Sequence, residues 1–250
     1  MSRRYSTYLT NASKENLALL VKDSTNHNTY SNAMYLLGKE LGNVLSAKID
    51  KTQRVCVACS VEDTDFLAKG IIEILTNNLI DVSLACFWNR RQPNLSIAPI
   101  LRKYQEPNVN NAKILIVVKS VISSACVVKT NLTNLIQKIE PDIIFVVAPV
   151  IYKDAPLSLQ QEFPEYISNK FQYIYFAEDS IKRENGELCP GIGGNVYQRL
   201  GFKDQDDKNR TTPNLVKERR ATLSMFLRNI GFVFVTSCFT LQIFAESFLF

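Results

Sequence analysis

The chain has 250 residues, of which 46% are hydrophobic, and its formal net charge is +5. This length suits one α/β domain with appended segments, and the hydrophobic fraction is that of a globular protein with a buried core. The basic residues are scattered except around residues 217–228, without the basic stripe and aromatic platforms of a nucleic-acid-binding protein. We therefore expect no nucleic-acid partner.

Six cysteines lie mostly in apolar runs, and residues 1–13 lack the apolar stretch of a secretory signal. These features predict reduced thiols in an intracellular, reducing compartment. Cys56 and Cys59 have redox or zinc spacing, but in a strand residues three apart point to opposite faces, so we interpret both as core residues. The sequence contains one histidine, His27. Metal sites with several histidines are therefore excluded, and a Ser-His-Asp triad would have to use His27. We expect no metal site.

The chain begins with two predicted helices, at residues 16–22 and 30–45, where apolar residues recur at three-four spacing. Short apolar runs rich in β-branched and aromatic residues follow, with no polar alternation, which is typical of strands buried on both faces. The predicted strands are 55–58, 82–88, 114–118, 143–148 and 173–176, and the predicted helices between them are 64–75, 124–139 and 157–169. This alternation predicts an α/β fold with a mainly parallel sheet flanked by helices.

Ligands of such folds bind at the carboxyl ends of the strands, so function is expected in the loops that enter the helices. The loop after strand 114–118 contains Ser123 and Ser124 just before a predicted helix. Backbone amides at a helix N-terminus can hold a phosphate, and serines at this position can also cap the helix. On the local sequence alone, capping is the favoured interpretation.

The order of elements from residue 171 onward is distinctive. A strand is followed by Asp179, an Asn-Gly pair, the run Pro190-Gly-Ile-Gly193 and then Gly201-Phe202. With the N-terminal helices, this order resembles the uracil phosphoribosyltransferase family over about residues 10–203. The resemblance implies a type I phosphoribosyltransferase-like fold, often dimeric. Working members transfer the phosphoribosyl group of phosphoribosyl pyrophosphate, held with magnesium, to N1 of uracil, giving UMP and pyrophosphate.

The loops that would hold the donor depart from the family's pattern. In the donor loop an aspartate is replaced by Lys119, a threonine by Ser124, and two glycines by Ala125 and Cys126. Side chains in place of the glycines crowd the approach of backbone amides to the 5'-phosphate.

The Arg-Ala-Gly of the pyrophosphate loop falls at residues 62–64, where Glu62 and Asp63 would repel a diphosphate. Arg90 or Arg91 is the candidate for a retained phosphate contact. Glu62 and Lys119 are predicted to pair as a substitute salt bridge.

The uracil loop is retained in part, because Pro190, Gly191 and Gly193 match the family's pattern. Downstream, Gly194 and Tyr197 stand where the family has carboxylates. A flat base can still bind such a loop, and the alternative is that the glycine-rich run is only a tight turn. The candidate ligand-binding residues are Ser123, Ser124, Arg90, Pro190, Gly191, Gly193 and Gly194. The degraded positions are Glu62, Lys119, Ala125, Cys126 and Tyr197, and no catalytic residue is assigned.

The chain continues beyond the family's usual end. We expect the α/β domain over residues 1–203, a linker over 204–216 and a hydrophobic tail helix over 217–250. Residues 230–250 are strongly apolar and about long enough to span the ~30 Å core of a bilayer, with a basic flank before them. A membrane anchor, a helix docked on protein and a disordered extension are the three interpretations.

The leading functional prediction is a catalytically inactive homologue that acts as a binding, scaffold or regulatory subunit, with a protein partner or a second copy. The alternative is a weakly active uracil phosphoribosyltransferase of nucleotide salvage, and only then is magnesium expected. A sensor of uracil or nucleotide without chemistry is the third hypothesis. The abundance of Asn, Ile and Lys is associated with AT-rich genomes, so a plastid is a candidate location.

Overall fold

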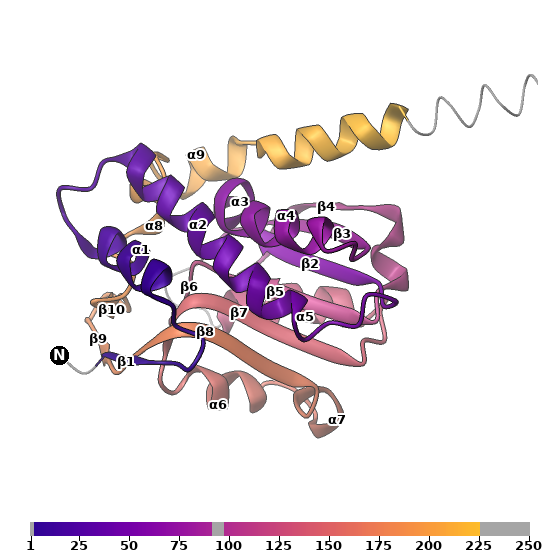
Figure 1. The fold of residues 1–250 in the computed structure, drawn as a ribbon, viewed down its shortest axis with the longest axis horizontal. Coiled ribbons are helices and arrows are strands. Elements are labelled where there is room, and N and C mark those ends of the chain that lie inside the picture. The colour runs from indigo at the N-terminus through magenta and orange to yellow at the C-terminus, as the bar shows by residue number, and fades with distance from the viewer. Residues whose placement is uncertain (1–2, 92–97, 226–250) are drawn as a thin grey trace, which may run out of the picture. The chain divides into compact units, whose positions relative to one another are not determined.

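A computed structural model describes residues 3–91 and 98–225. The chain consists of two compact units, with the boundary between residues 212 and 213. The first unit contains an eight-stranded sheet with the order β1-β8-β7-β5-β2-β3-β4, in which β6 pairs with β7 (Figure 1). In the second unit, residues 214–225 are helical.

Five parallel strands form the centre of the sheet, and their order is β3-β2-β5-β7-β8. They are β2 (Val55–Ser60), β3 (Val82–Asn89), β5 (Ile114–Val118), β7 (Ile143–Tyr152) and β8 (Phe171–Asp179). The mainly parallel α/β fold predicted from the apolar runs is therefore confirmed. Strands β2, β3 and β5 are buried along their whole length, which explains why their sequences show no polar alternation.

Antiparallel strands close both edges of the sheet, and neither was expected from the sequence. Strand β4 (Ile100–Gln105) pairs with β3, and β1 (Arg3–Tyr5) pairs with β8. Residues 101–103 of β4 are exposed, and its polar and basic residues resemble a loop. The remaining short strands are β6 (Val121–Ile122) beside β7 and the pair β9 (Ile181–Lys182) and β10 (Leu188–Cys189).

One face of the sheet is covered by the N-terminal helices and the segment after β2. These are α1 (Asn11–Val21), α2 (His27–Ser46), α3 (Val61–Asp63), the π-helical turn η1 (Thr64–Ala68) and α4 (Lys69–Asn77). Gly38 lets α2 approach η1 closely, since a Cβ there would lie 2.2 Å from the Leu67 carbonyl oxygen. The predicted helix 64–75 corresponds to η1 and α4, and the predicted helices 16–22 and 30–45 to α1 and α2.

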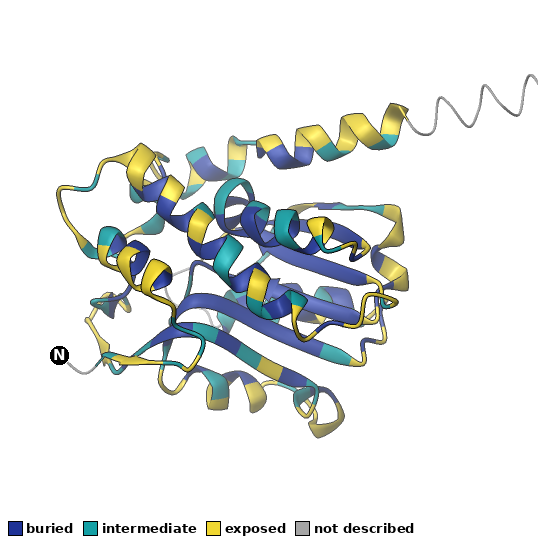
Figure 2. Cartoon of the chain, viewed as in Figure 1, coloured by how far each residue is buried: buried dark blue, intermediate teal, exposed yellow. Residues whose placement is uncertain are grey.

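The opposite face packs against η2 (Pro107–Asn111), α5 (Cys126–Ile136), α6 (Ala155–Gln160) and α7 (Glu165–Ser168). In Figure 2 the central strands are dark blue, whereas the outer faces of α1 and α2 are yellow. The predicted helix 157–169 is two short helices, because Pro164 begins a new one as the N-cap of α7.

Cys56, Cys59 and Cys86 are buried core residues, whereas Cys126 and Cys189 are partly exposed. Cys56, Cys59, Cys86, Cys126 and Cys189 are free thiols. Cys56 joins the apolar core shared with α5, whereas the Cys59 sulfur lies 3.3 Å from the Thr64 hydroxyl on the other face of β2. The prediction that Cys56 and Cys59 point to opposite faces is confirmed.

Two short helices follow the sheet, α8 (Val196–Arg199) and α9 (Gln205–Arg210). The second lies within residues 204–216, which the sequence predicts as a linker. Of the predicted tail helix 217–250, only residues 217–225 belong to the described part, and the candidate membrane span 230–250 lies outside it. Within residues 3–91 and 98–225 no helix combines the length and apolar character needed to cross a bilayer.

Candidate functional site

The topology of the sheet places a ligand-binding edge between β2 and β5. The chain passes from β2 outward to β3, and then returns to the other side of β2 to form β5. In open α/β sheets the crevice outside the carboxyl ends of the strands at such a reversal is the usual ligand site. Here it is formed by residues 60–64, which follow β2, and by residues 119–125, which follow β5.

A buried cluster of charges fills the part of this edge above β2. Lys119 Nζ donates to Asp63 Oδ2 at 2.6 Å, to Ser60 Oγ at 2.7 Å and to Glu62 Oε1 at 2.8 Å. The backbone N–H of Ser120 donates to the second Asp63 oxygen at 2.8 Å. Lys208 Nζ lies 3.4 Å from Glu62 Oε2. We call Ser60, Glu62, Asp63, Lys119 and Lys208 the switch-point cluster.

The predicted Glu62–Lys119 pair is therefore present, and it is part of a larger network. Glu62 and Asp63 form the first turn of α3, where the helix dipole favours negative charge. Ser60 precedes this turn but makes no side-chain cap; its hydroxyl faces Lys119, Glu62 and Asp63 instead. The turn after β2 presents two carboxylates, and both already have partners within the cluster.

The cluster is electrically balanced, with two carboxylates against two ammonium groups. Burial alone would raise the pKa of Glu62, but Lys119 and Lys208 lower it to about 2. Burial alone would lower the pKa of Lys119, but the carboxylates of Asp63 and Glu62 raise it above its ordinary value. Glu62 and Lys119 are therefore ionised at neutral pH, and the pairing of opposite charges in the cluster offsets the cost of removing them from water.

A cavity of about 380 Å³ adjoins the cluster on the β5 side. Its floor contains Glu62, Lys119 and Ser120, and Arg91 also contributes to its lining. The Ser120 hydroxyl is buried and has no hydrogen-bond partner. The remaining lining residues come from the segment that runs from β6 into the first part of α5, and from residues 185–197, which include part of β10 and of α8: Val121, Ser123, Ser124, Val127, Val128, Asn185, Gly186, Glu187, Leu188, Gly191, Ile192, Gly194, Asn195, Val196 and Tyr197.

The N-terminus of α5 forms one wall of this cavity. The helix begins at Cys126 with Ala125 as N-cap, and no side chain caps it. The interpretation of Ser123 and Ser124 as capping residues is therefore wrong. Both line the cavity, so hydroxyl groups and the uncapped first turn of a helix lie at the same wall, an arrangement that suits an anion.

The loop containing residues 190–194 is held in place from three sides. The buried Asp179 carboxylate accepts the N–H of Gly191 at 2.8 Å and pairs with Arg3 at 2.7 Å. The buried Tyr30 hydroxyl donates to the Ile192 carbonyl at 2.9 Å. Gly193 has φ +79° and lies against α1, where a Cβ would be 1.9 Å from the Leu20 carbonyl oxygen. These contacts fix the shape of the loop more firmly than a surface turn requires.

The other predicted site residues are dispersed. Arg90 is exposed and pairs with Asp206 at 3.0 Å, whereas its neighbour Arg91 lines the cavity. Ala125 is buried at the start of α5, and Cys126, Pro190 and Gly193 are not among the cavity's lining residues. Burial raises the pKa of the Tyr197 phenol, so this residue presents a neutral ring to the cavity.

The sequence did not indicate three residues that stabilise the site. Arg3 belongs to a three-residue strand, and Tyr30 reads as an ordinary core residue of α2. Lys208 lies beyond the region of family resemblance in a polar stretch, where a lysine is normally solvent-exposed. The resemblance pointed to Asp179 as part of a pattern but did not indicate its role in holding Gly191.

The switch-point cluster does not fit a metal ion, because its carboxylates are engaged by ammonium groups, a hydroxyl and a backbone amide. Across residues 3–91 and 98–225 there is no group of three or more His, Cys, Asp or Glu side chains that could hold a metal.

Comparison with known proteins gives a likeness of fold. The AQ2163 protein from Aquifex aeolicus matches with a TM-score of 0.65 and 12% identity, over 78% of this chain and 97% of that one. The hypoxanthine-guanine phosphoribosyltransferase of L. donovani has a TM-score of 0.41 and 9% identity, over 70% of this chain and 92% of that one. The orotate phosphoribosyltransferase of Mycobacterium tuberculosis, solved with phosphoribosyl pyrophosphate, has a TM-score of 0.41 and 10% identity, over 67% and 90%. No family model and no curated protein sequence matches the chain.

Proposed function

We propose that this chain is a non-catalytic phosphoribosyltransferase-like protein whose cavity binds a pyrimidine base or its mononucleotide, as a sensing or regulatory subunit. The observation that carries the proposal is the balanced switch-point cluster. It occupies the turn after β2 where the resemblance to uracil phosphoribosyltransferases would place the donor's diphosphate.

The donor half of the site opposes a diphosphate for two reasons. Glu62 and Asp63 are negative, and the cations beside them are already neutralised by these same carboxylates. A diphosphate entering here would have to separate buried ion pairs, and leaving one buried partner unpaired typically costs about 3 to 5 kcal/mol. This cost falls on the donor and is absent for a ligand that stays on the β5 side.

The β5 half suits a smaller ligand with one anionic group. Its volume of about 380 Å³ lies at the lower end of the range of small-ligand sites, about 300 to 1,000 Å³. Ser123, Ser124 and the uncapped start of α5 can receive a phosphate, with Arg91 as the nearby cation. The loop 190–194 provides a rigid wall for a flat base, because Asp179, Arg3 and Tyr30 hold its Gly191 and Ile192 backbone groups in place.

The test is calorimetric titration of the full chain with uracil, with UMP and with phosphoribosyl pyrophosphate plus magnesium. We expect binding of UMP, of uracil or of both, and no binding of the donor. If neither uracil nor UMP binds, the proposal is wrong. If the donor binds, the switch-point cluster does not close the site to it.

The alternative is a weakly active uracil phosphoribosyltransferase, favoured by the retained hydroxyl of Ser124 and the retained Pro190, Gly191 and Gly193. Magnesium would then enter with the donor. Formation of UMP from radiolabelled uracil, lost on omission of magnesium and in Ser124→Ala, would establish this alternative and overturn the non-catalytic proposal.

A further inference from the structure

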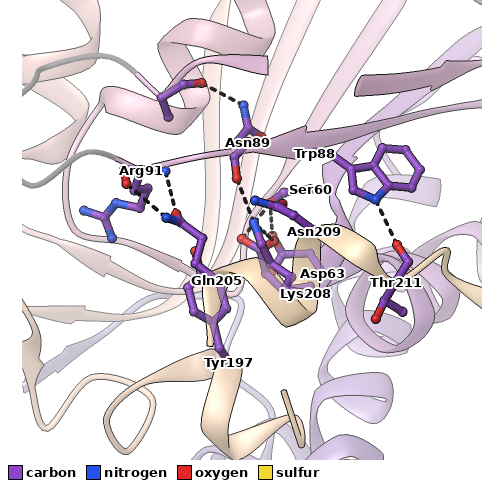
Figure 3. A network of polar contacts seen from close by, with 12 residues as sticks. Ser60, Asp63, Trp88, Asn89, Arg91, Tyr197, Gln205, Lys208, Asn209 and Thr211 are labelled. Carbon is purple, nitrogen blue, oxygen red and sulfur yellow. Dashed lines mark hydrogen bonds and ion pairs between the residues drawn. The ribbon is translucent and has the colours of Figure 1, made fainter. Parts of the chain in front are cut away.

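Residues 204–212, which we call the strap, run across the carboxyl ends of β2 and β3. Figure 3 shows the contacts that hold the strap in place. Trp88 Nε1 donates to the Thr211 carbonyl at 2.9 Å, and the N–H of Arg91 donates to Gln205 Oε1 at 2.6 Å. On the outer side, Arg102 donates to the same Thr211 carbonyl at 3.1 Å. One end of the strap is thus attached to β3 and β4, and the other end to the segment that follows β3.

Lys208 is the central contact of the strap. Its side chain is 1% exposed, and its ammonium group donates to the Asn89 carbonyl at 2.9 Å. It also lies 3.4 Å from Glu62 Oε2, an oxygen with no hydrogen-bond partner, and 5.1 Å from the centre of the Tyr197 ring. A buried ammonium group is costly unless paired, so Lys208 holds the strap down only while Glu62 is ionised.

The strap and the cavity share part of their lining. Glu62 and Tyr197 line the cavity and also contact Lys208. With the strap closed, Lys119 and Lys208 balance Glu62 and Asp63, and the floor of the cavity is neutral. With the strap open, Lys119 alone faces two carboxylates, and the floor carries a net charge of −1. An anionic ligand in the cavity is repelled only in the open state.

We propose that the strap is a closing element whose Lys208 tunes the cavity for anionic ligands: closure permits a mononucleotide, and opening disfavours it. By linkage, a bound mononucleotide must then hold the strap closed. The choice of ligand rests on the proposed function above, whereas the closure of the strap by Lys208 does not.

The only tryptophan of the chain reports the state of the strap directly. Trp88 is 1% exposed, donates to the strap and lies under the Arg102 guanidinium, 4.1 Å from the ring centre. In the full chain we expect a blue-shifted emission with little quenching by acrylamide. Lys208→Met should shift the emission to the red and raise the quenching constant severalfold, while Lys203→Met, an exposed neighbour with the same charge change, should leave both as in the wild type. Unchanged Trp88 emission in a folded Lys208→Met protein would overturn the closure.

The affinities for UMP and uracil test whether the charge of Lys208 favours an anionic ligand. Lys208→Met should weaken UMP binding about tenfold and leave neutral uracil unchanged. Glu62→Gln combined with Lys208→Met restores a neutral floor, so UMP affinity should recover although the strap remains open. Equal loss for UMP and uracil, or no recovery in the double variant, would overturn the coupling. If the wild type binds neither ligand, the proposed function and the coupling are both wrong. The emission of Trp88 then still tests whether Lys208 holds the strap closed.

Should Lys208→Met fail to fold, as judged by far-UV circular dichroism, Gln205→Ala serves as the milder variant, since it removes only the contacts with the Arg91 backbone. This variant should raise the quenching of Trp88 to a smaller extent, and addition of UMP should reverse the increase. If neither the substitution nor UMP alters the quenching, the proposal is contradicted.

Discussion

The two halves of the sheet's carboxyl edge have opposite character. Above β2 and β3, five side chains of the switch-point cluster and the strap fill the space with paired charges. Above β5, the start of α5 and the loop 185–197 surround a cavity of about 380 Å³. The difference shows that the charges above β2 neutralise one another and leave no space, whereas the side chains above β5 leave room for a ligand.

Removing Lys119 should destabilise the paired charges above β2 more than any other single change tested below. In Lys119→Met, Glu62 and Asp63 stay buried with only Lys208 as a partner, so the free energy of unfolding should fall by about 3 to 5 kcal/mol. Urea unfolding followed by circular dichroism measures the loss. Lys39→Met is the matched control, since its ion pair with Glu73 is about one-third exposed and its loss should change stability much less.

A double-mutant cycle with Glu62→Gln refines this prediction. The loss in Lys119→Met should become smaller when Glu62 is already neutral, because fewer carboxylates remain unpaired. Additive losses would mean that Glu62 and Lys119 are neighbours without energetic coupling.

Low pH should reduce the stability that the paired charges above β2 contribute. The pKa of Glu62 is lowered in the folded protein to about 2, so its stabilisation is present above the ordinary carboxyl value of about 4.3 and is lost as the pH falls toward 2. A shift of this size corresponds to about 3 kcal/mol. Stability curves of the wild type and of Glu62→Gln should converge across this window. Parallel curves from neutral pH down to the acid limit would show that Glu62 contributes nothing there.

On the β5 side, two glycines test how firmly the loop 190–194 is held against α1. Gly193→Ala places a Cβ on the Leu20 carbonyl oxygen at a positive φ, whereas Gly186→Ala has a similar φ of +81° and no atom within 4 Å. We expect Gly186→Ala to cost about 1 kcal/mol and Gly193→Ala about 2 kcal/mol more. Thermal unfolding with and without UMP measures both. Equal costs would mean that the loop is not held against α1.

The smallest expected effect concerns Arg91. The side chain is exposed at the cavity, so Arg91→Ala should leave stability unchanged and lower UMP affinity about tenfold, the value of one charge-assisted phosphate contact. Arg90→Ala is the control, because Arg90 pairs with Asp206 and does not line the cavity. Equal effects of both variants on UMP affinity would show that only the net charge matters.

The parts of the fold that sequence analysis predicted are those where burial leaves a simple signature. Residues 114–118 form β5 as predicted, because a strand covered on both faces must be apolar throughout. The Glu62–Lys119 pair was predicted because the family resemblance placed these opposite charges in two loops of the same site, and the structure contains it. Strand β4 was missed, since its residues 101–103 are exposed and its polar and basic residues resemble a loop.

The parts that were missed depend on contacts between distant segments. Lys208 becomes a buried residue only because the strap returns over β2, more than a hundred residues away in the chain, and its local sequence Gln-Asp-Asp-Lys-Asn-Arg is entirely polar. Similarly, Ser123 and Ser124 precede a helix as capping residues do, yet the backbone turns so that Ala125 becomes the N-cap. Local patterns carry no information on either event.

The central claim is that the cavity accepts a mononucleotide while the switch-point cluster excludes the donor. Its most direct test is calorimetric titration of the full chain with UMP and, separately, with phosphoribosyl pyrophosphate plus magnesium. We predict saturable heat with UMP and none with the donor. Micromolar binding of the donor, followed by formation of UMP when uracil is added, would contradict the account.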